Sequence, residues 1–173
     1  ARTLRAGEDP RSIPGLCYAG RDLPPDCLEL PSLNECERDR TVFIQMFHAF
    51  YRNNDPLRAR PLAQRQDSRY LIQNPPSPLP TTAELDRVHG LEYEREAHPY
   101  YARQEVRALE TIRFALVTHR GCYGECNFCA IAVHQGRTVT WRSRASILAE
   151  AEQLAAHPRF KGIIQDVGGP TAN

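Results

Sequence analysis

The residues best suited to chemistry are three cysteines that lie close together in the stretch CYGECNFC, residues 122–129. Cys122, Cys126 and Cys129 have the spacing C-x3-C-x2-C. Three thiolates at this spacing can hold three corners of a cubane 4Fe-4S cluster and leave the fourth iron without a protein ligand. An iron with an open position is a reaction site. The spacing therefore predicts an iron–sulfur centre that binds a further ligand.

The spacing of these cysteines leaves two other interpretations open. A structural zinc site needs four ligands, and His119 and His134 are the nearby candidates for the fourth. Such a site would make the chain a zinc-stabilised binding module without catalysis. A disulfide with one free thiol fits neither a reducing compartment nor the tight three-way spacing. The remaining cysteines, Cys17, Cys27 and Cys36, are scattered and predicted to be ordinary thiols.

The elements around this loop predict an α/β fold. Residues 112–118 are typical of a buried strand that leads directly into the cysteines. Ser143 is an N-cap candidate for a helix with apolar residues on one side, and residues 160–167 are typical of a second buried strand. This order is one β-α-β unit, the building block of parallel sheets and barrels.

A parallel pairing would place the cysteine loop at the carboxyl edge of the sheet, where α/β proteins bind their ligands. Gly168 and Gly169 end the second strand at this edge, and backbone without side chains lets a ligand approach closely. Gly121 and Gly124 give the loop itself the freedom to wrap a bulky cofactor. We therefore expect the loop and the Gly-Gly pair to share one site.

The part before residue 111 is predicted to be a helical and proline-rich linker region. Ser32 with Glu35, and Thr81 with Glu84, have the spacing of a helix capping box. Short strands are expected at residues 13–18 and 70–72, and residues 57–69 are expected to be a solvated connector. Four apolar side chains recur at helical steps after Ser32 and predict core packing: Phe43, Met46, Phe47 and Phe50.

Composition narrows the class of protein. Hydrophobic residues make up 41% of the 173 residues, and 22 basic against 21 acidic side chains leave a net charge of +1. This balance argues against disorder and against a nucleic-acid partner. No apolar run approaches the ~18 residues that cross a bilayer, so no membrane partner is expected. Residues 1–10 lack the apolar core of a signal peptide, so a cytoplasmic location is expected.

The cysteine loop and its neighbouring elements resemble those of the radical S-adenosylmethionine (SAM) superfamily. The resemblance lies in the C-x3-C-x2-C loop after a first strand, the aromatic Phe128 before the last cysteine and the Gly-Gly pair after a second strand. The wider stretches THRGCYGECNFCAIAVHQGRTVTWRSRASIL and FKGIIQDVGGPTAN resemble the YgiQ family of large radical SAM proteins. Upstream, LPS, RYLIQNPP, LPTTAELDRV and HPYY are similar to that family too, so the resemblance covers roughly residues 11–173.

The resemblance implies a role for each matching residue. Cys122, Cys126 and Cys129 would ligate the 4Fe-4S cluster, and the open iron would bind the amino and carboxylate groups of SAM. Phe128 would lie beside the adenine, and Gly168 and Gly169 would approach the methionyl amino group. An electron donor would reduce the cluster, and SAM would be cleaved to methionine and a 5'-deoxyadenosyl radical that acts on an unknown substrate.

One departure from the family pattern concerns the acidic contact to SAM. Many radical SAM proteins have Gly-Gly-Glu where this chain has Gly-Gly-Pro, so Asp166 or a residue beyond Asn173 would have to supply the carboxylate. Polar residues that flank the cysteines are further candidates for contact with SAM or the sulfurs: His119, Arg120, His134, Gln135 and Arg137.

The resemblance also implies a domain organisation. Residues 1–26 would be the C-terminal edge of an upstream domain, residues 27–110 the helical and linker region, and residues 111–173 the first β-α-β unit of a partial (β/α) barrel. A full barrel needs ~200 residues or more. We therefore expect the chain to be an internal part of a longer protein whose remainder completes the site.

Overall fold

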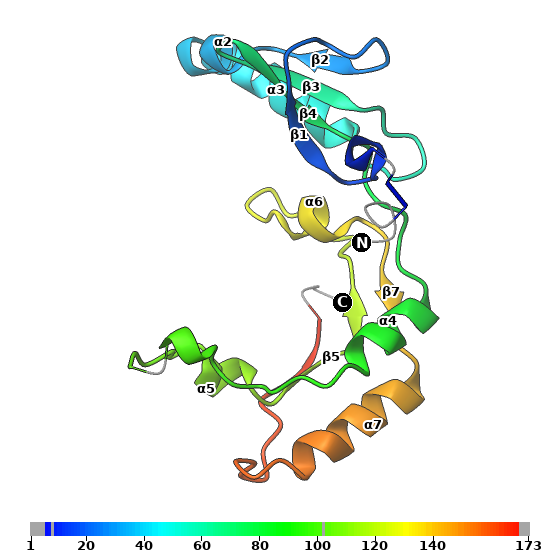
Figure 1. Cartoon of the computed structure of the whole chain (residues 1–173), viewed down its shortest axis with the longest axis vertical. Helices are drawn as coiled ribbons and strands as arrows, with labels where there is room; N and C mark the ends of the chain where they lie inside the picture. The colour runs from blue at the N-terminus through cyan, green and yellow to red at the C-terminus, as the bar shows by residue number, and fades with distance from the viewer. Residues whose placement is uncertain (1–5, 8, 102, 170–173) are drawn as a thin grey trace. The chain divides into compact units, whose positions relative to one another are not determined.

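The computed structural model describes residues 6–7, 9–101 and 103–169 (Figure 1). The chain divides into two units, Ala1–Leu79 and Pro80–Asn173, which are described separately below. This division differs from the expected boundaries after residues 26 and 110. The three-part organisation of the whole protein remains a prediction.

The first unit is built on a four-stranded mixed sheet. In space the order is β1 (Cys17–Gly20), β4 (Arg69–Gln73), β3 (Leu62–Gln66) and β2 (Leu28–Leu30). β4 is antiparallel to both β1 and β3, and β2 is parallel to β3. Its buried centre consists of Cys27, Ala63 and Ile72, with Tyr18 and Tyr70 packed against it. A short 3-10 helix, η1 (Pro10–Ser12), precedes the sheet.

The sheet corrects the prediction of a helical and linker region over residues 27–110, because three of its strands, β2, β3 and β4, fall within that range. The expected connector at residues 57–69 contains β3, in which Leu62 and Ala63 are buried. The sequence misleads here because Gln64, Arg65 and Gln66 make the strand polar over most of its length. Pairing on both sides, with β2 and β4, is what makes this polar segment a strand.

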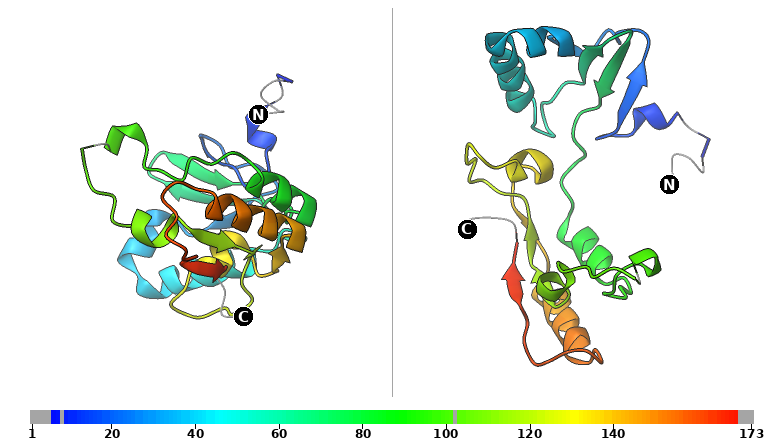
Figure 2. Two further views of the ribbon diagram at one scale, coloured as in Figure 1. Left: turned by 90° about the horizontal axis from the view of Figure 1, so that it is seen from below. Right: turned by 90° about the vertical axis from the view of Figure 1, so that its left-hand side faces the viewer.

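Two helices, α2 (Leu33–Arg38) and α3 (Arg40–Arg52), connect β2 to β3 and lie on one side of the sheet (Figure 2). The predicted capping box begins α2. The Ser32 hydroxyl accepts from the Glu35 amide at 3.3 Å, and the Glu35 carboxylate accepts from the Ser32 amide at 2.8 Å. Asp39 then caps α3 through the Thr41 amide, so the helical segment expected after Ser32 consists of two helices.

The aromatic stripe of α3 does not form a core in the described part of the chain. Phe43 and Phe47 are 48% and 43% exposed, whereas Met46 and Phe50 are half-buried. Successive helical residues are rotated by about 100°. Positions 42, 46, 49 and 50 are half-buried and lie on one face of the helix. Positions 43 and 47 fall one step around the helix from 42 and 46, so the prediction was wrong for Phe43 and Phe47.

The second unit consists of short elements. Their order is α4 (Thr82–His89), η2 (Pro99–Tyr101), α5 (Leu109–Ile112), β5 (Ala115–Val117), β6 (His119–Arg120), α6 (Ile131–Gln135), β7 (Thr140–Trp141), α7 (Arg144–Ala155) and β8 (Asp166–Gly168). β5 and β8 are parallel, and β6 and β7 are antiparallel. The second predicted capping box is present at α4, which Gly90 ends. Among the described residues, none of the helices combines the length and the apolar composition of a membrane-spanning segment.

The parallel pairing of β5 and β8 with α7 between them in sequence confirms the predicted β-α-β order. In Figure 2 the two strands run side by side. Phe114, Leu116 and Leu154 form the buried cluster that joins the helix to β5. The mixed α/β class is thus observed, and the barrel remains a prediction.

The extent of the two strands differs from the prediction. The segment 112–118 begins in α5, and Ile112 is 59% exposed. The segment 160–167 is extended only at its end, and Ile163 and Val167 are 66% and 59% exposed. Phe160 and Ile164 instead pack from the preceding loop against the buried cluster. Their apolar character reflects this loop packing and not a buried strand.

Candidate functional site

The cysteine loop lies between β6 and α6, so the short strand β6 separates it from β5, the strand that it was expected to follow directly. All three thiols are free. Cys122 is buried, Cys129 is half-buried and Cys126 is exposed. The loop therefore has one anchored end and an accessible middle.

Two of the three sulfurs converge on Gly124. Its backbone N–H donates to Cys122 Sγ at 3.4 Å, and a Cβ added at Gly124 would lie 3.4 Å from Cys122 Sγ and 3.7 Å from Cys126 Sγ. The Cys129 amide donates to the Cys126 carbonyl at 2.9 Å and forms the turn that carries the third thiol. Across the described ranges, no three His, Cys, Asp or Glu side chains are grouped closely enough to hold a metal ion.

The residues of the cysteine loop can be tested for their fit to an iron–sulfur cluster by their ligand type and by the position of their sulfurs. Thiolate is the ligand type that such clusters use, and the chain presents three thiols on one loop. Cys122 and Cys126 share a side of Gly124, and a backbone N–H already points to one sulfur. The donor set and the convergence of two sulfurs fit the cluster, while Cys129 is not brought into a group with them.

Phe128, the predicted neighbour of adenine, is 93% exposed. Tyr123, on the same loop, is 64% exposed. The loop thus presents aromatic surface to solvent next to its thiols.

Gly168, the last residue of β8, and Gly169, which follows it, lie in different surroundings. Thr118 donates its amide to the Gly168 carbonyl at 2.7 Å, and nothing lies within 4 Å of a Cβ added at Gly168. A Cβ at Gly169 would lie only 2.6 Å from His119 Nε2. The imidazole of His119 therefore occupies the space that any larger residue at position 169 would need.

His119 connects the glycine pair to the start of the cysteine loop. Its Nδ1 lies 2.8 Å from the Thr118 hydroxyl, and its backbone pairs with Trp141 across the β6–β7 ladder. The sequence marks His119 as a polar neighbour of the cysteines and as a candidate fourth ligand of a zinc site, but not as a neighbour of Gly169. Its contact with Gly169, fifty residues later, arises from the β5–β8 pairing and has no local sequence signal.

The other candidates are more dispersed. Asp166 pairs with Ala115 at the opposite end of the β5–β8 ladder from Gly168 and is exposed. Pro170 and the residues after it lie outside the described part. His134 is exposed on α6, and Arg120 is exposed on β6. The two histidines weighed as zinc ligands are thus not grouped with the thiols within the residues that the structure describes.

Arg142 holds the end of the strand that leads to the loop, a role that its sequence context does not indicate. Its side chain is 1% exposed. The backbone N–H donates to the Thr118 carbonyl at 2.9 Å and Nη1 donates to the Val117 carbonyl at 2.8 Å. Both carbonyls at the carboxyl end of β5 therefore have buried donors.

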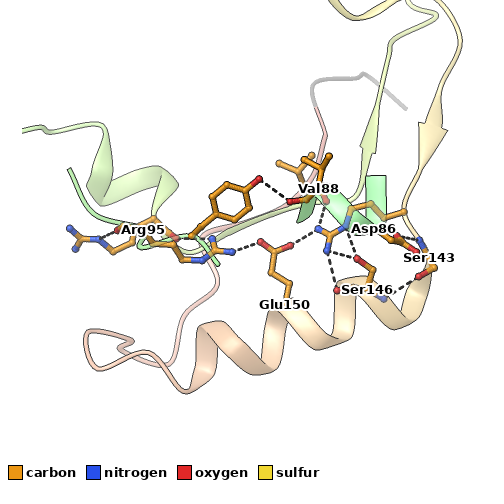
Figure 3. Close-up of polar contacts among 10 residues, drawn as sticks. Asp86, Val88, Arg95, Ser143, Ser146 and Glu150 are labelled. Atoms are coloured by element: carbon orange, nitrogen blue, oxygen red, sulfur yellow. Dashed lines mark hydrogen bonds and ion pairs between the residues drawn. The ribbon is translucent and has the colours of Figure 1, made fainter. Parts of the chain in front are cut away.

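A buried ion network supports Arg142. Figure 3 shows Glu150 on α7 beside Arg95. The Glu150 carboxylate pairs with the guanidinium of Arg95 and with that of Arg142. Arg142 also donates to the Ser146 hydroxyl and carbonyl. At the start of α7, Asp86 accepts from the Ser143 amide at 2.9 Å, and the hydrogen bonds from Ser143 lower the pKa of Asp86.

Comparison with known proteins identifies relatives over the full length of the chain. Residues 1–115 match the profile of a family described as Radical SAM N-terminal. A UPF0313 protein of Fusobacterium nucleatum is 52% identical over 100% of this chain and 31% of its own length. UPF0313 proteins of Thermotoga maritima and Methanosarcina acetivorans are 43% and 39% identical, over 94% and 100% of the chain and 29% and 27% of their own lengths. The chain thus spans about a third or less of these relatives. No solved structure matches it.

Proposed function

The chain belongs to the Radical SAM N-terminal family, and we propose from this premise that Cys122, Cys126 and Cys129 bind a 4Fe-4S cluster for the reductive cleavage of SAM. The resemblance to radical SAM proteins of the YgiQ type is confirmed by the family match and the relatives. Because the chain spans less than a third of those relatives, the activity of the whole protein, its electron donor and its substrate are part of the proposal.

The observation that carries the proposal is the convergence of Cys122 and Cys126 on Gly124, in a loop next to the carboxyl end of a parallel strand pair. Ligands of α/β proteins bind at that edge. When bound, a cluster with three protein thiolates supplies an open iron for SAM and the electron that cleaves SAM to methionine and a 5'-deoxyadenosyl radical.

Other residues of the site would bind and orient SAM. Phe128, with its ring exposed, would contact the adenine. Gly168 offers open backbone to the methionyl amino group, whereas at Gly169 the imidazole of His119 already occupies the adjoining space. Asp166 lies at the opposite end of the β5–β8 ladder from Gly168, which argues against an acidic contact from Asp166 to SAM.

Metal analysis of the three loop variants tests the cluster assignment. In the full-length protein, purified without oxygen, Cys122→Ala, Cys126→Ala and Cys129→Ala should each lose iron and labile sulfide, since three thiolates leave no spare ligand. Cys17→Ala, Cys27→Ala and Cys36→Ala are the matched controls and should retain both. Zinc without sulfide in the wild type, or full iron in all three loop variants, would contradict the proposal.

Reductive cleavage is a separate assay. With dithionite and SAM, the loaded wild-type protein should form 5'-deoxyadenosine, and the Cys126→Ala protein should form none. A loaded and reduced protein that leaves SAM intact, both alone and with cell extract as a source of substrate, would exclude the reaction while leaving the cluster assignment in place.

A further inference from the structure

The first half of the cysteine loop is supported by one segment, residues 135–138, which we call the backing segment. At the start of the loop, the Cys122 amide donates to the Gly136 carbonyl at 3.0 Å. The Gly121 amide donates to the Gln135 side-chain oxygen at 3.3 Å. A Cβ at Gly121 would collide with the Thr138 carbonyl oxygen. The backbone of the two segments is therefore in direct contact just before the first thiol.

The middle of the loop is tied to the same segment by an ion pair. Glu125 lies between Cys122 and Cys126, and its carboxylate pairs with the guanidinium of Arg137. Glu125 has a positive φ of 46°, a left-handed conformation that costs energy for a residue with a side chain. Such a conformation persists where surrounding contacts stabilise it, and the ion pair is such a contact.

We propose that Arg137 and Glu125 are positioning residues that keep the first half of the cysteine loop, from Cys122 to Cys126, ordered before any cluster is present. The assignment of the cluster to this loop rests on the proposed function, but the ordering of the metal-free loop does not. Arg137 acts on Glu125, whose backbone conformation sets the direction of the chain between Cys122 and Cys126.

The partial exposure of the pair limits the size of the effect. The side chains of Arg137 and Glu125 are 27% and 48% exposed, so water and salt screen their attraction. For an ion pair of this kind, loss of one partner changes a local opening equilibrium by about threefold. The backbone contacts of Gly121 and Cys122 remain, so the loop should open more often without unfolding the unit.

Alkylation of Cys122 in metal-free protein tests the pair directly. Cys122 is buried and should react mainly when the loop opens. Arg137→Gln and Glu125→Gln should each raise its modification rate by about threefold at low salt, and less at high salt. A direct charge effect on thiol reactivity would shift the two variants in opposite directions, so a rise in both indicates opening.

Controls separate this local role from general destabilisation. Buried Cys27, in the other unit, should react at an unchanged rate in every variant. Arg107→Gln removes an exposed ion pair with Glu105, in the same unit, and should leave the Cys122 rate unchanged. The charge-reversed protein Glu125→Arg/Arg137→Glu should recover part of the protection. Wild-type alkylation rates in both single variants would overturn the proposal.

Cluster loading provides the second measurement. In the full-length protein, both single variants should take up iron and sulfide about threefold more slowly than the wild type and reach the same final content. Equal loading rates would show that the ion pair has no role in cluster assembly. If the wild type takes up no cluster, the proposed function fails, and the alkylation rates alone decide whether the pair orders the loop.

Discussion

Strand pairing in Ala1–Leu79 extends over four residues between β1 and β4 and five between β3 and β4, whereas in Pro80–Asn173 β5 and β8 pair over only three residues. The first unit has an apolar sheet centre, with Ile72 2% exposed. The second buries Arg142 and Glu150 together with its apolar cluster. The stability of the unit with the candidate site thus depends on buried polar side chains, whereas the stability of the first unit depends on a longer strand ladder.

This difference predicts which kind of substitution each unit tolerates. A long ladder distributes its stability over many similar backbone hydrogen bonds. The short strands of the second unit depend on a few side chains, among them Arg142, that satisfy strand-end carbonyls. We therefore expect single polar substitutions to have large effects in the second unit and single apolar substitutions to have them in the first.

The largest effect is expected for Glu150→Gln, which leaves the buried Arg142 without its anionic partner. Breaking a buried ion pair from one side costs about 3–5 kcal/mol of unfolding free energy. Urea unfolding followed by the fluorescence of Trp141, the single tryptophan, measures it. Glu96→Gln is the matched control, because Glu96 also joins two arginines but is 31% exposed, and it should cost under about 1 kcal/mol. Equal costs would refute the comparison.

The corresponding change in the first unit is Ile72→Ala. Removing this buried side chain should cost about 3 kcal/mol through lost burial and a cavity. Amide hydrogen exchange in β3 and β4 should accelerate while that in α7 does not. Leu71→Ala, at the 41% exposed neighbouring position, should change exchange only slightly. Equal acceleration in α7 would show that the two units do not unfold separately.

At the strand end, Gly169→Ala should destabilise the second unit by about 1–3 kcal/mol, because the added methyl group meets the His119 ring. The double variant His119→Ala/Gly169→Ala should recover most of the loss. Gly168→Ala introduces the same methyl group into open space and should cost less. Thermal unfolding monitored at Trp141, which pairs with His119, measures all three. A double variant no more stable than Gly169→Ala would argue against the contact.

A smaller effect, of equal size in the two units, is expected at the capping boxes that begin α2 and α4. Ser32→Ala and Thr81→Ala each remove the hydroxyl of a capping box and should cost about 1 kcal/mol. Hydrogen exchange should localise the losses to α2 and α4 respectively. Costs that differ by more than about 1 kcal/mol would mean that the surrounding packing, and not the cap, determines them.

The smallest expected effect is a pH dependence at His89. Burial, followed by the charge of Arg142, lowers the pKa of His89 below 6.5. The unfolded chain then binds a proton more readily than the folded one, so stability should fall as the pH drops below about 6.5 and level off below the folded pKa. Urea midpoints at pH 7.5 and 5.5 should differ less in His89→Gln than in the wild type. An equal difference would exclude His89 as the cause.

Several features of the fold were predictable because their causes are local. Each capping box depends on two residues three positions apart, and both are present. The β-α-β order followed from apolar segments around the Ser143 cap, and β5 and β8 are parallel as expected. The strand β3 was missed, since its polar residues become a strand only through pairing with β2 and β4. The exposure of Phe43 was missed because a helical stripe does not indicate which face meets the sheet.

For the candidate site, the sequence by itself determined the identity and spacing of the three thiols, and with them the chemistry that the loop can support. Only the tertiary structure decided what lies against that loop. The His119 ring over Gly169, Arg142 on the end of β5 and Arg137 on Glu125 all join residues from separate segments. Such contacts depend on strand pairing and chain direction, which no short motif encodes, and arginine is too common in this chain to mark them.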